Sequence, residues 1–142
     1  MVDEKRKSYN IDKNEPTLVN RLRDLLILTN VYLNHAPKHE KYSLCREIRD
    51  KTYEIHNYVV EAHKRYHKKT TLTNLDIAHE QLRSLWHTFW KLGYFSAKDG
   101  IKLKQRSPLD RYNAISVLIN EIGAMIGGWI KADKEKNLQK AS

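Results

Sequence analysis

The sequence predicts an all-α protein, an up-down-up-down bundle of four helices. Apolar residues recur at alternating spacings of three and four along four segments, and proline or polar linkers separate these segments. No run of alternating apolar and polar residues is long enough to predict a strand. Four helices joined by short linkers pack antiparallel. The 142 residues suit one domain whose core is stable without disulfides or metals.

The first helix follows a polar arm. Residues 1–16 are polar and mixed in charge and predict a flexible arm, residues 17–135 form the bundle, and residues 136–142 form a polar tail. Pro16 stands where the first turn of a helix tolerates proline, and the helix ends before Pro37. Its stripe consists of Leu18, Leu22, Leu25, Leu26, Thr29 and Leu33.

The second helix begins after Ser43, a possible N-cap, and runs to about His67. Its apolar stripe consists of Leu44, Ile48, Ile55, Val59, Ala62 and Tyr66. The third helix is expected to begin at Thr73 as its cap, with Asp76 favourable to the helix dipole, and to run to about Tyr94. Its inward face consists of Leu75, Ala78, Leu82, Leu85, Phe89 and Leu92, with Trp86 and Trp90 beside them.

The fourth helix begins with Ser107 as N-cap and Pro108 at the first helical position. Three glycines, Gly123, Gly127 and Gly128, interrupt it, although glycine costs about 1 kcal/mol relative to alanine inside a helix. We interpret them as packing residues that let a neighbouring helix approach closely at Gly123 and Gly127, while Trp129 closes the end of the core.

The charge favours a polyanionic partner. The chain carries 26 Lys and Arg against 17 Asp and Glu, a formal net charge of +9. The single cysteine, Cys45, cannot form an internal disulfide, which favours a reducing compartment, and we expect the cytoplasm. The charged N-terminus and the absence of an apolar run of about 18 residues predict no membrane association.

The third helix carries a basic stripe beside its apolar face. His79, Arg83, His87 and Lys91 recur every fourth residue. Such a line can follow a phosphate backbone, but it is also what an ordinary solvated helix face looks like. His87 would make its contribution depend on pH.

A second basic cluster ends the second helix. It contains Lys64, Arg65, Lys68 and Lys69. These cations either complement the negative end of the helix or contact phosphates without reading sequence. Tyr66 could stack on a base, although the apolar stripe assigns it to the core. Weaker candidates for contact with a partner or a phosphate backbone are Arg46, Arg49, Lys102, Lys104 and Arg106.

Catalysis and metal binding have little support. His63 and His67 stand four apart, as zinc ligands on a helix do, but neither an HExxH motif nor a cysteine pair accompanies them. Cys45 lacks an evident base, and no glycine-rich phosphate loop is present. We therefore expect no enzyme activity, no metal and no cofactor.

Several segments together resemble a known family. They are Pro37-Lys38-His39, the helix opening Tyr42-Ser43-Leu44-Cys45-Arg46-Glu47-Ile48-Arg49, the pair Leu82-Arg83, and Glu121-Ile122-Gly123-Ala124-Met125-Ile126-Gly127-Gly128-Trp129-Ile130. Over roughly residues 17 to 132 the chain resembles the four-helix-bundle family that includes the accessory variability determinant (Avd) of diversity-generating retroelements. The same family includes proteins encoded by intervening sequences in bacterial large-subunit ribosomal RNA genes.

The resemblance implies a function. Avd proteins are homopentamers that bind the reverse transcriptase of the retroelement and its template RNA, support mutagenic synthesis of complementary DNA, and are not enzymes. Arg83 and His87 fall where Avd proteins often carry basic residues needed for binding. The alternative is a bundle of the intervening-sequence type, an interaction protein without an established function.

Overall fold

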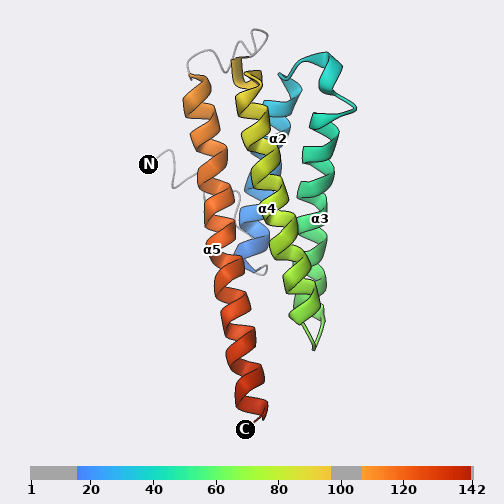
Figure 1. Cartoon of the computed structure of the whole chain (residues 1–142), viewed down its shortest axis with the longest axis vertical. Helices are drawn as coiled ribbons and strands as arrows, with labels where there is room; N and C mark the ends of the chain where they lie inside the picture. The colour runs from blue at the N-terminus through green and yellow to red at the C-terminus, as the bar shows by residue number, and fades with distance from the viewer. Residues whose placement is uncertain (1–15, 97–106, 142) are drawn as a thin grey trace.

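The computed structural model is a bundle of four long helices (Figure 1). The structure describes residues 16–96 and 107–141, so the predicted arm and the linker cations Lys102, Lys104 and Arg106 lie outside the described residues. The helices are α2 (Thr17–Asn34), α3 (Leu44–Lys64), α4 (Lys69–Lys91) and α5 (Pro108–Ala141), with short 3-10 helices η1 (Lys38–Glu40) and η2 (Tyr94–Ser96). The described part of the chain contains no strand, and the predicted all-α class is confirmed.

Each long helix runs antiparallel to the next, and α5 closes the ring by packing on α2 as well as on α4 (Figure 1). The predicted up-down-up-down order is therefore confirmed. The apolar stripes meet along the bundle axis, where every helix contributes residues that are almost completely buried. The largest of these are Trp86, Phe89, Leu22, Leu25, Ile48, Ile55, Leu72, Leu75, Leu82, Ile115, Ile119 and Ile122.

Two residues assigned to the core are not part of it. Tyr66 is 70% exposed because α3 ends at Lys64, before the stripe reaches it, and Leu92 is 51% exposed because it lies just beyond the last turn of α4. Near the C-terminal end of α4, the core is completed instead by Phe95 of η2, which contacts Trp86 and Phe89. Gly93, between α4 and η2, has φ +79°, a conformation that glycine adopts without strain.

One predicted helix start is confirmed and another is wrong. The Oγ of Ser107 accepts the backbone N–H of Asp110 at 3.1 Å, as expected of an N-cap. Thr73 caps nothing, since α4 begins four residues earlier and the Thr73 hydroxyl donates to the carbonyl of Lys69 at 2.9 Å. The additional turn forms because Thr71 and Leu72 are buried, and the Thr71 hydroxyl donates to Glu61 of α3 at 2.9 Å.

The three glycines of α5 lie in different environments. A Cβ at Gly123 would lie 2.7 Å from Cε1 of His79, so the predicted close approach is confirmed there, with a side chain of α4 as the neighbour. At Gly127 and Gly128 a Cβ would meet nothing within 4 Å, and both residues are exposed. The predicted close packing at Gly127 is wrong because this part of α5 turns Gly127 and Gly128 to the outside of the bundle.

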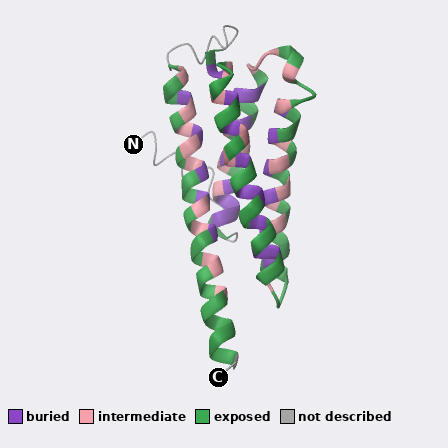
Figure 2. Ribbon diagram, viewed as in Figure 1, coloured by how far each residue is buried: buried purple, intermediate pink, exposed green. Residues whose placement is uncertain are grey.

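The last part of α5 extends beyond the other helices (Figure 1). Residues 134–140, which include most of the predicted polar tail, are helical and exposed (Figure 2). We call residues 133–141 the C-terminal extension. These residues continue the helix that packs in the bundle, so the extension keeps a fixed direction relative to the bundle.

By length and composition alone, α5 is long and apolar enough to cross a membrane. Its inward residues Ile115, Ile119, Ile122 and Ile126 are buried against the rest of the bundle, and core helices of globular proteins pass the same test. The expectation of no membrane association stays a prediction.

Candidate nucleic-acid and partner interface

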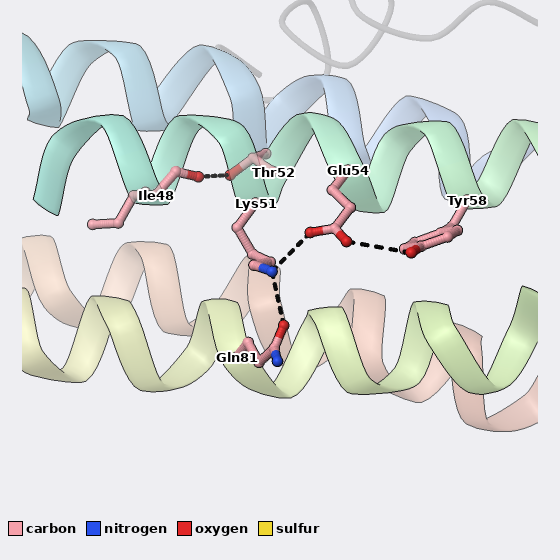
Figure 3. Close-up of polar contacts among 6 residues, drawn as sticks. All are labelled: Ile48, Lys51, Thr52, Glu54, Tyr58 and Gln81. Atoms are coloured by element: carbon pink, nitrogen blue, oxygen red, sulfur yellow. Dashed lines mark hydrogen bonds and ion pairs between the residues drawn. The ribbon is translucent and has the colours of Figure 1, made fainter. Parts of the chain in front are cut away.

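The positive charge is unevenly distributed, because the outer face of α3 is largely acidic. A shallow depression there is lined by Asp50, Tyr53, Glu54, Asn57, Tyr58 and Glu61. Lys51 lies beside it, with its ammonium 2.7 Å from Glu54 and 2.8 Å from the side-chain oxygen of Gln81 on α4 (Figure 3). Carboxylates along this face disfavour a phosphate backbone, so the candidate interface lies elsewhere.

The predicted stripe on α4 is interrupted at its first member. His79 is buried, and its Nε2 donates to the backbone carbonyl of Ile119 on α5 at 2.8 Å. Because a carbonyl only accepts, this contact requires the tautomer protonated at Nε2. The prediction that His79 contributes to a binding surface is therefore wrong. Gly123 leaves room for its ring, so His79 is part of the contact between α4 and α5.

Arg83 and His87 line a groove between α4 and α5. The guanidinium of Arg83 donates to the side-chain oxygen of Asn120 and lies 3.5 Å from the carboxylate of Glu80. Nδ1 of His87 and the hydroxyl of Tyr112 are hydrogen-bonded at 3.0 Å. Both side chains reach the surface, but each already contacts neighbouring side chains. A ligand that binds to Arg83 or His87 would therefore have to replace these contacts.

The floor of this groove includes Trp86, whose indole N–H is buried and has no hydrogen-bond partner among the described residues. The groove measures about 470 Å³ and is lined by Glu80, Arg83, Ser84, Trp86, His87, Tyr112, Ser116, Ile119 and Asn120. Lys91, the last predicted member of the stripe, is exposed in the last turn of α4.

The second predicted cluster surrounds the turn between α3 and α4. Lys64, Arg65 and Lys69 are exposed, and Arg65 makes a long contact of 3.9 Å with Glu61. Lys68 has a structural role, because its ammonium donates to the carbonyl of Arg65 at 2.6 Å and to that of Ala62. These bonds satisfy carbonyls at the end of α3. For Lys68 the structure thus supports the interpretation that the cation complements the negative end of α3. Its positive charge still adds to the surface around the turn.

The C-terminal extension adds two lysines that sequence reasoning did not select. The ammonium of Lys140 lies 4.3 Å from the ring centre of Tyr66 and donates to its hydroxyl, and that of Lys136 lies 6.0 Å from the same centre. Lys140 lowers the pKa of the Tyr66 hydroxyl through this hydrogen bond and its charge. We call the resulting surface the basic end; it consists of Lys64, Arg65, Lys68, Lys69, Lys136 and Lys140.

Trp129 ties α5 to the same end. Its ring and that of His63 on α3 are 4.4 Å apart, tilted by 31°. Burial lowers the pKa of His63, and the charge of Lys68 adds to this effect. Trp129 is partly buried, in agreement with its predicted place at the end of the core.

Arg46 and Arg49 lie at the opposite end of the bundle, where α3 begins (Figure 1). Arg49 donates to the side-chain oxygens of Asn30 at 3.4 Å and Asn34 at 3.2 Å, which links α3 to α2. Arg46 lies 3.7 Å from Asp50. The structure therefore separates the predicted basic residues into three places and does not unite them in one surface.

Within residues 16–96 and 107–141, no three His, Cys, Asp or Glu side chains are grouped so that they could hold a metal ion. Cys45 is buried, and burial raises the pKa of its thiol, which disfavours the reactive thiolate.

A family model described as bAvd-like matches residues 17–132. No curated protein matches the chain. No solved structure matches it either. The match covers α2, α3, α4 and the bundled part of α5 and stops where the C-terminal extension begins. The chain belongs to the bAvd-like family.

Proposed function

We propose that this member of the bAvd-like family is a non-catalytic accessory factor of a diversity-generating retroelement. It binds the reverse transcriptase and its template RNA or complementary DNA and supports mutagenic synthesis, while the enzyme carries out the polymerisation. The observation that carries the proposal is the family match over residues 17–132, which spans the packed part of all four helices.

The distribution of charge supports a role in binding nucleic acid. The basic end gathers six Lys and Arg side chains around one turn and the C-terminal extension, and the acidic residues in these segments are Glu61, at the end of α3, and Asp133 and Glu135. Exposed lysines and arginines attract a phosphate backbone without selecting its sequence. Such a surface suits a factor that handles a template and its copies.

We also propose that the chain assembles with copies of itself as a homopentamer. Subunits of charge +9 repel one another unless low-charge surfaces or a polyanion hold them together. One surface suits such contact, because between Tyr112 and Trp129 α5 carries a single charged residue, Glu121, and half-exposed apolar residues. Mass measurement in solution tests the assembly, and a monomer at micromolar concentration would contradict it.

Co-expression with the reverse transcriptase encoded beside the gene, followed by purification at moderate salt, tests the central proposal. We expect the two proteins to copurify, and synthesis on the cognate template RNA to depend on this chain. The control is the Cys45→Ser variant, whose buried substitution leaves the surface unchanged. Equal complementary DNA yield and error spectrum with and without the chain, or no copurification, would refute the proposal.

A further inference from the structure

We propose that the C-terminal extension is a nucleic-acid-binding element, in which Lys136 and Lys140 contact phosphates of the same strand that the α3–α4 turn binds. This inference rests on the proposed function, since it assumes that nucleic acid is a ligand. It adds a part of the chain that lies outside the matched residues 17–132.

The geometry of α5 places these two lysines on one side of the helix. At 100° per residue, Lys136 and Lys140 fall within about 40° of each other and on the same side as Trp129. Trp129 contacts His63 and both lysines lie over Tyr66, so this side of α5 is directed at the α3–α4 turn. The remaining lysines of this region, Lys131 and Lys134, fall on the opposite side.

The contact with Tyr66 holds a cation where it adds to an already positive surface. Like charges placed together oppose folding, and Lys136 and Lys140 are brought onto Tyr66, which lies within three residues of Lys64, Arg65 and Lys69 in the sequence. The dipole of α5 favours Lys140 near its C-terminus, but it does not require contact with the α3–α4 turn. A bound phosphate backbone would neutralise both groups of lysines at once.

Tyr66 acts here as a positioning residue. It is 70% exposed, its hydroxyl accepts from Lys140, and its ring attracts both ammonium groups. An exposed tyrosine that contacts two lysines keeps the end of α5 aligned with the turn. Phosphates that enter between the turn and the extension would therefore meet ordered cations, which lowers the entropic cost of binding.

The test compares two double variants in the full chain, K136Q/K140Q and the matched control K131Q/K134Q, which removes the same charge from the opposite side of α5. Binding to a single-stranded RNA oligonucleotide is measured across a series of salt concentrations. Each lost phosphate contact lowers the slope of log affinity against log salt by about 0.7 for a single strand. We expect K136Q/K140Q to lower the slope by about 1.4 and to weaken binding about tenfold near physiological salt, with the control nearly unchanged.

Y66F sharpens the test, because it removes the hydroxyl bonded to Lys140 but keeps the charges. We expect a loss of affinity with a smaller change in the salt slope than in K136Q/K140Q. Helical content and oligomer mass are measured for every variant, and both should be unchanged.

Equal weakening by the two double variants would overturn the inference, because positive charge on either side of this part of α5 would then suffice. Unchanged binding of K136Q/K140Q beside a wild type that binds RNA with a steep salt dependence would also overturn it and leave the proposed function intact. A wild type that binds vesicles of anionic lipid through these lysines, but not RNA, would overturn both.

Discussion

The two halves of α5 treat basic side chains differently. Between Tyr112 and Trp129, α5 carries a single charged residue, Glu121, and engages polar residues of α4: Ile119 accepts from His79, Asn120 accepts from Arg83, and Tyr112 contacts His87. The lower half is charged and leaves the bundle beside the α3–α4 turn, where Lys64 and Lys69 face solvent. A basic residue opposite a helix becomes part of the packing, whereas one beyond the last packed turn stays available to a ligand.

The largest effect on nucleic-acid binding is expected at the turn. K64Q/R65Q/K69Q removes about three phosphate contacts, so affinity for single-stranded RNA should fall about fiftyfold near physiological salt. Filter binding or fluorescence anisotropy measures the change. The control is R46Q/R49Q at the opposite end of the bundle. An equally large loss of affinity in R46Q/R49Q would contradict this comparison, because the cations at the turn would then contribute no more to binding than those at the other end of the bundle.

Gly123 and Gly127 test the packing of α5 directly. G123A places a methyl group against His79 and should destabilise the fold by a net of about 1 to 2 kcal/mol, since overpacking exceeds the gain in helix propensity. G127A meets open space and should stabilise the free protein by about 1 kcal/mol. Denaturant unfolding measures both. A change in the free energy of unfolding with the same sign in G123A and G127A would contradict the structure.

The α4 face should contribute less to binding than the turn. R83Q/K91Q is expected to weaken RNA binding only about fourfold, the loss of about one phosphate contact, because Arg83 is engaged with Asn120 while Lys91 is exposed. R83Q alone should then change affinity little. A single R83Q variant that lost as much affinity as K64Q/R65Q/K69Q would show that a ligand displaces Asn120.

The smallest effect is expected from pH at His63. Burial and the charge of Lys68 hold the pKa of the His63 ring below its ordinary value, so the ring gains its proton at a lower pH than an ordinary histidine does. Its neighbours are Lys68 and the Trp129 ring. A bound phosphate would raise this pKa, so binding should take up a proton and tighten at lower pH. Between about pH 7.5 and 5.5 the wild type should gain about threefold more affinity than H63Q. The same pH dependence of affinity in the wild type and in H63Q would exclude a contribution of His63 to binding.

The sequence predicted the fold well because the core depends on patterns that one chain displays. The apolar stripes, Pro108 and the Ser107 cap predicted the helices and their order, and Gly123 predicted a close contact. The role of each basic residue was harder to predict. His79 and Lys91 have the same periodicity along α4, and only the position of α5 decides that one is buried and the other exposed.

The basic end shows the same limit. The sequence places Lys136 and Lys140 in a polar tail, because nothing local indicates that they lie over Tyr66, which is more than 60 residues earlier in the chain. Conversely, Lys68 resembled its neighbours in sequence but satisfies carbonyls at the end of α3. Contacts between distant segments set these roles, and periodicity does not report them.

The seam between α2 and α5 has a consequence for the entropic cost of folding. Each consecutive pair of helices is joined by a single connection, whereas α2 and α5 are the first and last helices and are paired across the seam by Arg21 and Glu121 at 3.3 Å. Closing this seam carries the largest loop entropy in the bundle, while pairing α3 with α4 requires only a tight turn. Among the pairs of neighbouring helices in the bundle, the α3–α4 hairpin, with the basic turn at its tip, therefore carries the smallest loop-closure cost.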